Sequence, residues 1–234
     1  MLMKAMILAA GLGTRLRPLT NSIPKALVEV NGKPLLQHAL EHLKQFEITE
    51  VIVNVHHFAG MIMEFLEAND NFGLKISVSD ESDELLETGG GVKKAEWFLR
   101  NREPFLVRNV DVLSDLDLLQ MLLFHRENSP LATLAVRNRE SSRYFLFDDR
   151  DRLSGWENRK SGETKISRPG IQLHAMAFSG IQILQPEIFT LMPEYRRFSL
   201  TDVYIQLAAN YAILGYPEKN ALWKDIGRRE QTHH

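Results

Sequence analysis

Hydrophobic positions recur with two different periods along the first half of the chain. Residues 4–10 and 51–55 are short, nearly continuous apolar runs, typical of strands that are buried on both faces. Residues 35–46 instead place apolar side chains three and four positions apart, which predicts an amphipathic helix. The alternation continues with helices and strands in turn at 61–68, 75–78, 92–99, 105–110 and 116–126. This order predicts a mostly parallel sheet with helices on both faces.

The second half of the chain is less regular. Its pattern predicts strands at 132–137, 144–147 and 175–183, a polar hairpin region at 150–165, and helices at 186–191 and 200–214. No internal repeat, low-complexity tract or linker interrupts the chain. We therefore predict one domain over residues 1–234, in which the second half extends the same sheet or is inserted into it.

Composition narrows the classes of protein and of chemistry. Of the 234 residues, 44% are hydrophobic and 25% are charged, which is ordinary for a globular protein with a sizeable core. The formal net charge of −2 argues against a nucleic acid or an anionic membrane as partner, because both would favour a strong basic excess. The absence of cysteine excludes disulfides, zinc-thiolate sites and a cysteine nucleophile.

The N-terminus superficially resembles a signal peptide, with a lysine before an apolar stretch. That stretch, residues 5–10, is shorter than the roughly 7–15 residues of a signal core, and it leads directly into a glycine-rich turn, as a buried first strand does. No apolar run approaches the roughly 18 residues that span a bilayer. We therefore expect a cytoplasmic protein.

The most informative stretch follows the first predicted strand. It contains Gly11 and Gly13, then Arg15, with Lys25 further on. Glycines at the end of a buried strand let backbone N–H groups approach a phosphate, since no Cβ intervenes. An arginine and a lysine would add positive charge beside that phosphate. The stretch is neither a Walker A loop nor a dinucleotide fingerprint, whose third glycine is replaced by Leu16.

The whole string Leu-Ala-Ala-Gly-Leu-Gly-Thr-Arg-Leu-Arg-Pro-Leu-Thr at 8–20, with Pro-Lys at 24–25, resembles the signature of the sugar-phosphate nucleotidyltransferases. The resemblance implies a single-domain, three-layer, Rossmann-like α/β fold with a mixed, mostly parallel central sheet. Residues 1–130 would then form a nucleotide-binding half and residues 131–234 a sugar-binding half.

By the same resemblance, the substrates are a nucleoside triphosphate and a sugar 1-phosphate, and the products are a nucleotide sugar and pyrophosphate. Arg15 and Lys25 would be catalytic residues, on the leaving pyrophosphate and on the α-phosphate. The nucleotide would rest on the glycine loop formed by Ala10, Gly11, Leu12 and Gly13.

Nucleotidyl transfer requires a divalent cation to offset the charge of the phosphates, and Mg²⁺ prefers carboxylates together with phosphate oxygens and water. Asp111 follows the apolar run 105–110, at the carboxyl end of a predicted strand, where ligands bind in open α/β folds. We therefore predict Asp111 as a catalytic residue and Mg²⁺ ligand. Asp115 and Asp117 are interpreted as the cap and first turn of the next helix.

The residues 223–227 resemble a late Trp-x-Asp-x-Gly element of the family. The resemblance makes Asp225 the second Mg²⁺ ligand. The chain departs from the family pattern here, because Val110 stands where a glycine usually precedes the first metal aspartate, which narrows the space beside the metal. Arg228 and Arg229 also replace the usual Thr-Pro.

Residues 87–91, Glu-Thr-Gly-Gly-Gly, start a predicted helix whose first N–H groups would hold a phosphate or a sugar hydroxyl. We assign Gly89 to the nucleotide, and Thr88 and Gly90 to the sugar. The element is similar to that of the N-acetylmuramate-1-phosphate uridylyltransferases of peptidoglycan recycling, and the overall length also fits that subgroup.

Further sugar-binding residues are expected in the second half. Glu157 and Asn158 occupy the place of the family's Glu-Lys-Pro-like element, although the lysine is missing, and Gly180 belongs to a Phe-x-Gly element. Asp202, in Ser-Leu-Thr-Asp, is interpreted as a helix cap. A muramic acid carries a lactyl carboxylate that needs a cation, for which the candidates are Arg137, Arg139, Arg143 and Arg168.

The base is harder to predict. Asp80 or Glu81, after the strand at 75–79, is a candidate contact to the base edge, but neither carboxylate separates uracil from cytosine or guanine. The predicted pair is UTP and N-acetylmuramic acid 1-phosphate. Guanylyl transfer to mannose 1-phosphate or heptose 1-phosphate is the alternative.

A catalytically silent relative that senses a nucleotide sugar is disfavoured, because Arg15, Lys25 and both metal aspartates are present. A histidine-based hydrolase is disfavoured too, because neither histidine of the pair at 56–57 has a Ser or Asp partner at suggestive spacing. No nucleic acid or membrane partner is expected, and the protein would be a monomer or a small homo-oligomer.

Overall fold

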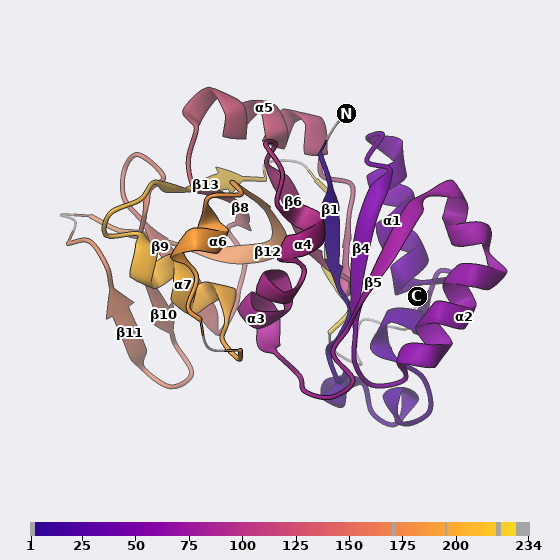
Figure 1. The fold of residues 1–234 in the computed structure, drawn as a ribbon. Coiled ribbons are helices and arrows are strands. Elements are labelled where there is room, and N and C mark those ends of the chain that lie inside the picture. The colour runs from indigo at the N-terminus through magenta and orange to yellow at the C-terminus, as the bar shows by residue number, and fades with distance from the viewer. Residues whose placement is uncertain (1–2, 170–171, 195, 219–220, 228–234) are drawn as a thin grey trace.

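One mixed β-sheet runs through both halves of the chain (Figure 1). The computed structural model describes residues 3–169, 172–194, 196–218 and 221–227. Within these residues the sheet has ten strands, in the order β11-β10-β9-β12-β6-β1-β4-β5, with β8 beside β12 and β13 beside β8.

Parallel pairing is concentrated in the N-terminal half of the sheet. β1 (Ala5–Leu8) lies between β4 (Glu50–Val55) and β6 (Phe105–Asn109), and β5 (Lys75–Asp80) lies outside β4. All three pairings are parallel. The carboxyl ends of these strands therefore meet at one edge of the sheet, as the alternation of strands and helices predicts.

The other half of the sheet is mainly antiparallel. The long strand β12 (His174–Leu184) pairs antiparallel with β6, with β8 (Ala132–Arg137) and with β9 (Arg143–Phe147). The predicted polar hairpin is confirmed as β10 (Leu153–Asn158) and β11 (Glu163–Ile166), which continue from β9. The mixed sheet is therefore confirmed.

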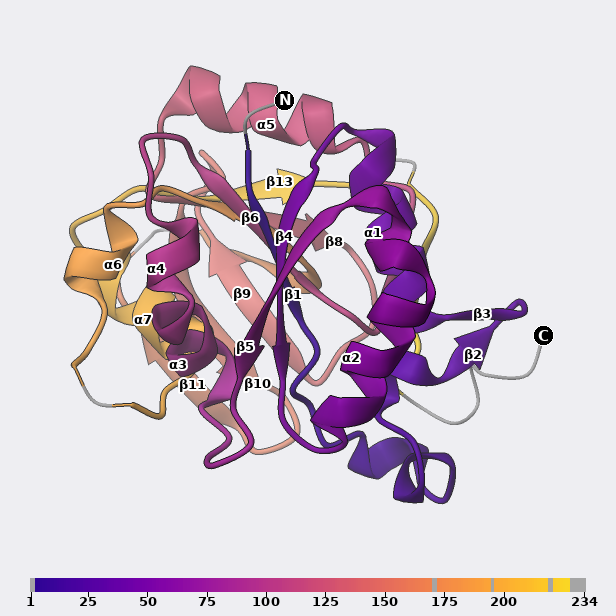
Figure 2. The same ribbon diagram turned by 45° about the vertical axis from the view of Figure 1, so that its right-hand side comes forward.

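Helices cover both faces of the sheet, which confirms the three layers (Figure 2). One face carries α1 (Leu35–Gln45), α2 (Ala59–Ala68) and α5 (Leu118–Asn128). The other carries α3 (Glu87–Lys94), α4 (Glu96–Leu99), α6 (Ile188–Leu191) and α7 (Leu200–Leu207).

Two hydrophobic cores follow from the alternation of side chains along the central strands. On β1, Ala5 and Ile7 belong to the core beneath α1, whereas Met6 belongs to the core beneath α3 and α7. Both faces of β1 are thus buried, which explains why its sequence is a continuous apolar run rather than an alternating one.

Helix α1 shows how the apolar periodicity becomes packing energy. Five of its side chains are fully buried. Burial of each leucine among them contributes up to about 1.5–3 kcal/mol of transfer free energy. The five are Leu35, Leu36, Ala39, Leu40 and Leu43. The predicted helix at 35–46 is confirmed to within one residue.

Two predicted helices are corrected by the structure. Helix α3 begins at Glu87 and contains the three glycines, and α4 follows after Ala95, whereas one helix at 92–99 was expected. Helix α7 ends at Leu207, and the expected continuation to residue 214 is instead β13 (Ile213–Pro217), parallel to β8. The pairing with a strand eighty residues earlier in the chain overrides the apolar spacing of this segment.

Two short two-stranded sheets flank the main sheet. β2 (Glu29–Val30) pairs with β3 (Lys33–Pro34), and β7 (Val112–Ser114) pairs antiparallel with β14 (Trp223–Asp225). The β7–β14 pair is not predicted from the sequence, because each strand has three residues and its partner is remote.

The two aspartates after β7 differ in role. Asp117 caps α5 by accepting hydrogen bonds from the N–H groups of Leu119 and Gln120, as predicted. Asp115 instead accepts one from Leu222 N at 2.7 Å, so its interpretation as a helix cap is wrong. Asp115 links β7 to the segment before β14.

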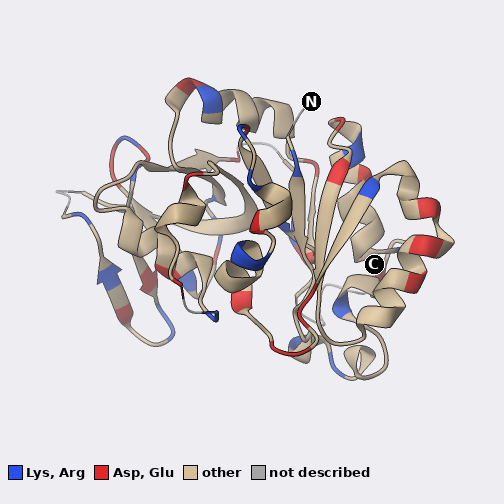
Figure 3. Ribbon diagram, in the orientation of Figure 1, with Lys and Arg blue, Asp and Glu red and all other residues tan. Residues whose placement is uncertain are grey.

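Charged side chains of both signs are spread over the elements visible in Figure 3. Within the described residues, no helix is long and apolar enough to cross a membrane. Arg228, Arg229 and the end of the chain lie outside the described residues.

Candidate active site

A pocket of about 250 Å³ opens at the carboxyl ends of the parallel strands. The ends of β1, β4 and β6 form one wall, and the segment that leads into α3 forms another. We call it the loop pocket, and its lining consists of Leu8, Ala10, Gly11, Lys25, Asn54, Leu85, Glu87, Thr88, Asn109, Val110 and Asp111. The fold thus brings the glycine loop, Lys25, Asp111 and the start of α3 to one place.

The two glycines of the loop differ in their surroundings. A Cβ added to Gly11 would meet nothing within 4 Å, and Gly11 lines the loop pocket. Gly13 has a φ of 61°, and its added Cβ would lie 2.8 Å from Thr20 Cγ2. Gly13 is required by the backbone and packing of the loop, whereas Gly11 leaves open the space where a ligand would lie.

The loop offers free donors to that space. The N–H groups of Gly11, Leu12 and Gly13 donate no hydrogen bond to any residue that the structure describes. Ala10 differs, because its N–H lies 3.4 Å from Asn54 Oδ1. Three neighbouring unused N–H groups at the end of a buried strand are suited to an anionic ligand.

A buried polar network supports the loop. Asn54 Oδ1 accepts from Ala9 N at 2.7 Å, and Asn54 Nδ2 donates to Glu81 Oε1 at 2.7 Å. Glu81 is 1% exposed, its Oε2 accepts from Leu86 N at 3.2 Å, and burial raises its pKa. Glu81 therefore ties the glycine loop to the wall before α3, and its interpretation as a contact to the base is wrong.

Asp80, the other candidate for the base, lies on the surface. It is exposed and accepts hydrogen bonds from the N–H and hydroxyl of Ser82, which lower its pKa. It does not belong to the lining of the loop pocket. The structure does not bring Asp80 together with the glycine loop.

Lys25 and Asp111 form an ion pair in the loop pocket. Lys25 lies in a short turn after Pro24, and Asp111 follows β6. The Lys25 ammonium donates to Asp111 Oδ2, and the two side chains are 11% and 16% exposed. Because the pair is partly buried, salt screens it less than a surface pair. The predicted catalytic lysine and the predicted metal aspartate are therefore in direct contact.

Asp225 lies next to Asp111 along the backbone of the β7–β14 pair. It is opposite Val112, and Ile226 N donates to Asp111 O at 2.9 Å. One oxygen of Asp225, Oδ1, accepts from Gly227 N at 2.7 Å. The two carboxylates predicted to share a metal thus come from adjacent backbone segments.

Arg15 reaches the same turn. A Cβ added to Gly227 would lie 2.6 Å from Asp225 Oδ1 and 2.9 Å from Arg15 Nη2. The guanidinium of Arg15 is therefore beside Asp225 and outside the lining of the loop pocket. The absence of a Cβ on Gly227 is what leaves room for both groups.

The N–H groups at the start of α3 are used within the protein. Gly89 N and Gly90 N both donate to Phe198 O, at 2.9 and 3.1 Å. A Cβ on Gly89 would overlap the Phe198 ring, and one on Gly90 would overlap the carbonyl oxygen of Arg196. The expectation that these two N–H groups hold a phosphate or a sugar hydroxyl is wrong. The glycines let the segment before α7 pack against α3.

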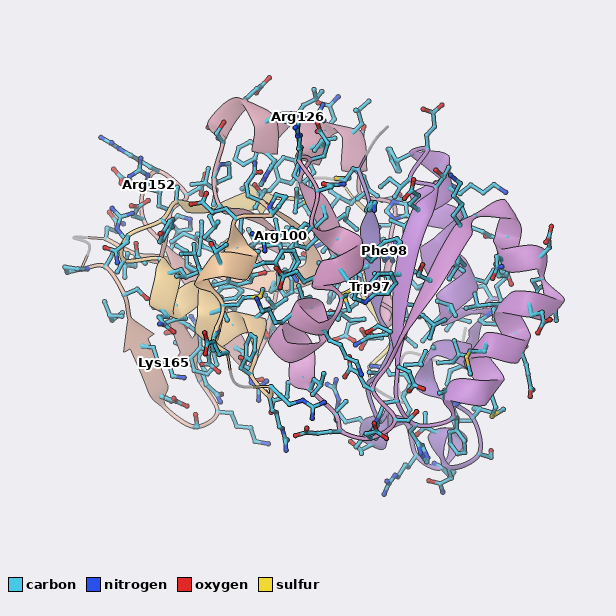
Figure 4. The ribbon with its side chains drawn as sticks, in the orientation of Figure 1. Trp97, Phe98, Arg100, Arg126, Arg152 and Lys165 are labelled. Atoms are coloured by element: carbon cyan, nitrogen blue, oxygen red, sulfur yellow. The ribbon has the colours of Figure 1, made fainter. Side chains whose placement is uncertain are left out.

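A second cavity, which we call the hairpin pocket, adjoins the loop pocket through Glu87 and Thr88. Its other lining residues are Arg143, Trp156, Lys165, Ser199, Thr201 and Asp202. Lys165 Nζ, on β11 (Figure 4), lies 2.9 Å from Asp202 Oδ1 and 5.5 Å from the centre of the Trp156 ring.

The start of α7 forms one side of the hairpin pocket. Ser199 is the N-cap of α7, because its hydroxyl accepts from Asp202 N. Asp202 lies in the first turn and accepts from the Ser199 hydroxyl, so its interpretation as the cap itself is wrong. Thr88 Oγ1 accepts from Leu200 N at 2.9 Å, so Thr88 also ties α3 to α7.

A third, more polar cavity lies beyond the loop pocket and is called the rim cavity here. It is lined by Arg15, Arg139, Glu140, Ser141, Ser142, Arg143, Asn158, Lys160, Trp223 and Asp225. Arg143 therefore lies between the hairpin pocket and the rim cavity. Arg137, by contrast, is bound to Glu218 at 2.8 Å, and Arg139 stacks on Trp223 at 4.3 Å.

Glu157 and Asn158 lie on opposite faces of β10, because side chains alternate along a strand. Asn158 faces the rim cavity, whereas Glu157 accepts from Arg159 Nε at 2.6 Å on the other face. Of these two expected sugar contacts, only Asn158 lines one of the three cavities. Asn158 lines the rim cavity together with Arg143, its cross-strand neighbour.

Gly180 has a structural reason to be glycine. Its φ is 83°, at an irregular register between β12 and β8, and an added Cβ would lie 2.6 Å from Val112 Cγ2. It lies in none of the three cavities. Gly180 lets β12 approach the residue that follows Asp111.

The lining of the loop pocket includes residues that the sequence-based prediction missed, among them two asparagines. Asn54 interrupts the apolar run of β4, and Asn109 ends β6. A polar residue near the carboxyl end of a buried strand is the signal that would have identified both. Val110, predicted to narrow the site, does line the loop pocket.

Comparison with known families and proteins gives a consistent result. Residues 4–233 match the sequence model of the family described as nucleotidyl transferase. The chain is 35% identical over 233 residues to N-acetylmuramate alpha-1-phosphate uridylyltransferase of Caulobacter vibrioides, covering 95% of this chain and 91% of that protein.

It is also 32% identical to mannose-1-phosphate guanyltransferase beta-A of Xenopus laevis, covering 97% of this chain but 61% of that protein. In fold, it is similar to a putative glucose-1-phosphate thymidylyltransferase from Bacillus anthracis, with a TM-score of 0.80 at 21% identity. That similarity covers 98% of this chain and 92% of the other.

Proposed function

This chain belongs to the nucleotidyl transferase family, and we propose that it transfers a uridylyl group from UTP to N-acetylmuramic acid 1-phosphate. The activity common to its relatives is nucleotidyl transfer to a sugar 1-phosphate, which releases pyrophosphate. The choice of UTP and of the muramic sugar rests on the 35% identity to the uridylyltransferase, which extends over nearly the full length of both proteins.

The main support for an enzymatic function is the set of chemical groups that line the loop pocket. Unused N–H groups of the glycine loop, the Lys25 ammonium and the Asp111 carboxylate lie around one cavity. Donors and a cation suit the phosphates of a nucleotide, and the carboxylate suits a bound cation. Residues 1–130 supply this pocket, which supports their role as the nucleotide-binding half.

The chain's residues fit a magnesium ion. Asp111 and Asp225 come from adjacent backbone segments, and no group of three or more metal-ligating side chains exists in the described part of the chain. Two carboxylates suit Mg²⁺, which completes its shell with phosphate oxygens and water. When bound by these two residues, the ion would offset negative charge on the phosphates.

The reaction requires no general base from the protein. A sugar 1-phosphate is already largely dianionic at neutral pH, since the second pKa of a phosphate monoester is near 6. One of its oxygens attacks the α-phosphorus of UTP, and the bond from that phosphorus to the leaving pyrophosphate breaks. Lys25 binds the α-phosphate in the loop pocket, and Arg15, beside Asp225, binds the departing pyrophosphate. Catalysis is then positioning and charge neutralisation.

The sugar side is assigned to the hairpin pocket and the rim cavity, which residues 131–234 largely form. Arg143 lines both cavities and is not bound to a carboxylate within the described chain. It is the arginine that we assign to the lactyl carboxylate. Asn158 is its cross-strand neighbour and offers an amide to the same ligand.

Guanylyl transfer to mannose 1-phosphate is the second candidate. Its support is the 32% identity to the guanyltransferase of Xenopus laevis, although this chain spans only 61% of that protein. A role in peptidoglycan recycling belongs to the first candidate, whereas a cytoplasmic location is proposed for either.

A pyrophosphate-release assay decides between the candidates. UTP, CTP, GTP, ATP and dTTP are each combined with the 1-phosphates of N-acetylmuramic acid, N-acetylglucosamine, glucose and mannose, with Mg²⁺ present. We expect the highest kcat/KM for UTP with the muramic substrate. A kcat/KM ten times higher for GTP with mannose 1-phosphate would overturn the substrate assignment and leave nucleotidyl transfer standing. Absence of pyrophosphate with every pair would overturn both.

A further inference from the structure

Arg108 stands on β6 in the middle of the sheet, where the side chains beside it are apolar. Its cross-strand neighbours Ile7 and Ile181 are fully buried in the core beneath α1, and Arg108 itself is 1% exposed. Burial lowers the pKa of its guanidinium to about 10, and the Asp111 carboxylate opposes that shift, so Arg108 is charged near pH 7. Burying a charge is costly, and an apolar side chain at such a position often stabilises a core more. Core packing alone therefore does not account for Arg108.

The guanidinium of Arg108 joins β6 to the strand that follows Asp111. Its Nη2 donates to Val112 O at 2.6 Å, and its Nη1 donates to His42 Nδ1 at 2.8 Å. Hydrogen bonds from a charged donor are stronger than those between neutral groups. Arg108 and Val112 lie on either side of the turn that contains Asp111. The bond between them therefore closes this turn and fixes the backbone one residue beyond Asp111.

His42, on α1, holds the other end of the same strand. Because an arginine can only donate, His42 Nδ1 is the acceptor, and Nε2 carries the proton and donates it to Leu116 O at 3.0 Å. Burial and the Arg108 charge lower the pKa of His42 to about 4, so its ring is neutral near pH 7. Val112 is the first residue of β7, and Leu116 lies two residues beyond its end. We call Arg108 and His42 the β7 clamp.

Strand β7 lies outside the main sheet, which makes such anchors important. Within the described residues, it pairs only with β14, and each strand has three residues. A two-stranded sheet is at best marginally stable by itself. β14 has its own link to the main sheet, since Trp223 Nε1 donates to Ser179 O at 2.9 Å. The β7 clamp supplies the corresponding link for β7.

Both carboxylates proposed for Mg²⁺ depend on where β7 is fixed. Asp111 directly precedes it, and Asp225 on β14 lies opposite Val112, whose carbonyl Arg108 holds. Ile226 N, next to Asp225, donates to Asp111 O at 2.9 Å. A shift of β7 would therefore move Asp111 relative to Asp225.

We propose that Arg108 and His42 are positioning residues, which hold Asp111 and Asp225 at the spacing that one Mg²⁺ requires. Neither residue lines the loop pocket, the hairpin pocket or the rim cavity, so both act through the backbone of β7. The proposal rests on the proposed function, because that function supplies the metal. The hold of the clamp on β7 is nevertheless measurable without metal or substrate.

Two variants of the full chain loosen the clamp. Arg108→Met keeps a long side chain but removes the bonds to Val112 and His42. His42→Leu removes the acceptor for Arg108 and the donor to Leu116. The matched control is His125→Leu on α5. His125 is also a buried histidine, it bonds to Thr133, and it lines none of the three cavities. Urea midpoints measure the loss of stability in each variant.

The first measurement is hydrogen exchange of the Ile226 amide, followed by NMR in protein without metal or substrate. This amide donates to Asp111 O, so its protection reports how firmly the two carboxylate segments are joined. We expect exchange at least ten times faster in both clamp variants than in the His125→Leu control.

The second measurement is metal affinity. Mn²⁺, as a paramagnetic substitute for Mg²⁺, is titrated in the presence of a UTP analogue with a methylene bridge between its α- and β-phosphorus atoms. Electron paramagnetic resonance reports free Mn²⁺. We expect the Kd of the ion that Asp111→Asn loses to rise at least tenfold in both clamp variants. Calorimetry in EDTA should show the affinity for the UTP analogue itself unchanged within twofold, because the loop pocket is intact.

Unchanged Ile226 exchange or unchanged Mn²⁺ affinity in both clamp variants would overturn the proposal. Equal changes in His125→Leu would overturn it too, since they would reflect stability alone. If Arg108→Met fails to fold, His42→Leu decides. If neither folds, the wild type decides through the ¹⁵N chemical shifts of the His42 ring, because a proton on Nδ1 instead of Nε2 would contradict the clamp.

Failure of the proposed function gives a different result. The wild type would then bind no Mn²⁺ at Asp111, while faster Ile226 exchange in the clamp variants would still support the hold on β7. Failure of the clamp alone would leave Mn²⁺ binding and pyrophosphate release by the wild type untouched.

Discussion

Lys25 and Asp111 form an ion pair in the loop pocket, although they lie in segments that are far apart in the sequence. The pair matters because each partner is proposed to act on a charged ligand: Lys25 on the α-phosphate and Asp111 on Mg²⁺. In the protein alone, each offsets the charge of the other. Substrate and metal would replace these contacts with stronger ones, and the pair keeps both side chains in place until then.

Asp111→Asn should lower kcat/KM by about a hundredfold or more, at least the scale seen when one preorganised hydrogen-bond donor is removed from an active site. The amide keeps the shape of the side chain but cannot supply the charge that holds Mg²⁺. Pyrophosphate release measures the loss, and EDTA should stop the wild-type reaction. Asp149→Asn, on an exposed loop, is the control. Full activity of Asp111→Asn would mean that the metal is held elsewhere.

Gly11→Val should fold normally but bind nucleotide poorly. A Cβ at this position meets no protein atom within 4 Å, so the branched side chain occupies only the space proposed for the phosphates. Calorimetry with UTP measures the affinity, and circular dichroism checks the fold.

Gly13→Val is the matched comparison in the same loop. Its positive φ and its contact with Thr20 should cost about 1–3 kcal/mol of stability, visible as a lower urea midpoint. Normal UTP binding by Gly11→Val would remove the loop from the nucleotide site.

Arg15→Ala should depress kcat more than it raises the KM for UTP. The guanidinium lies beside Asp225, and its proposed contact strengthens as negative charge builds on the departing pyrophosphate. Steady-state kinetics over a range of UTP concentrations measure both constants. Arg17→Ala, two positions further along the same exposed segment, should change neither. A change in KM alone would make Arg15 a binding residue only.

Arg143→Glu should harm the use of N-acetylmuramic acid 1-phosphate far more than that of N-acetylglucosamine 1-phosphate, which lacks the lactyl carboxylate. The reversed charge repels that carboxylate between the hairpin pocket and the rim cavity. The ratio of the two kcat/KM values should fall at least tenfold. Arg102→Glu, on the surface and outside all three cavities, serves as the control. An unchanged ratio would show that another group recognises the acid.

The stability of the fold should fall as the pH is lowered from about 6.5 to about 4. Burial lowers the pKa of His42 and of His125 to about 4, from 6.5 in the unfolded chain. Between these values the unfolded state binds protons that the folded state does not. Each histidine therefore lowers the free energy of unfolding by about 1.4 kcal/mol for each unit by which the pH falls.

Urea midpoints measured across this pH range check the slope of stability against pH. His125→Gln should make it shallower, because one of the two groups no longer titrates. An identical slope in this variant would contradict the assignment of that pKa.

Local sequence patterns were sufficient to identify much of the sheet and its helices. The boundaries of α1, β4 and β8 agree with prediction within a residue or so, because each is set by apolar periodicity inside one segment. The glycine loop is likewise encoded locally, since Gly13 needs its positive φ whatever packs against it.

Residues whose role depends on a distant partner could not be predicted in this way. The glycines of α3 were expected to face a ligand, but Phe198 and Arg196, about a hundred positions later, pack against them. The segment at 213–217 has apolar spacing compatible with a helix, and only β8 beside it makes it a strand. Glu157 and Asn158 were both assigned to the sugar by the family resemblance, yet strand geometry sends them to opposite faces.

The sequence alone identified the family and the glycine loop, because the order of glycines, arginine and lysine lies within one short segment of the chain. The tertiary structure decided which residues meet there. Asp111 and Asp225 become neighbours through the three-residue pairing of β7 with β14, and Asn54 and Glu81 become the support of the loop because both are buried beside it. Such contacts are made between remote segments by burial and hydrogen bonding, and no pattern within either segment carries them.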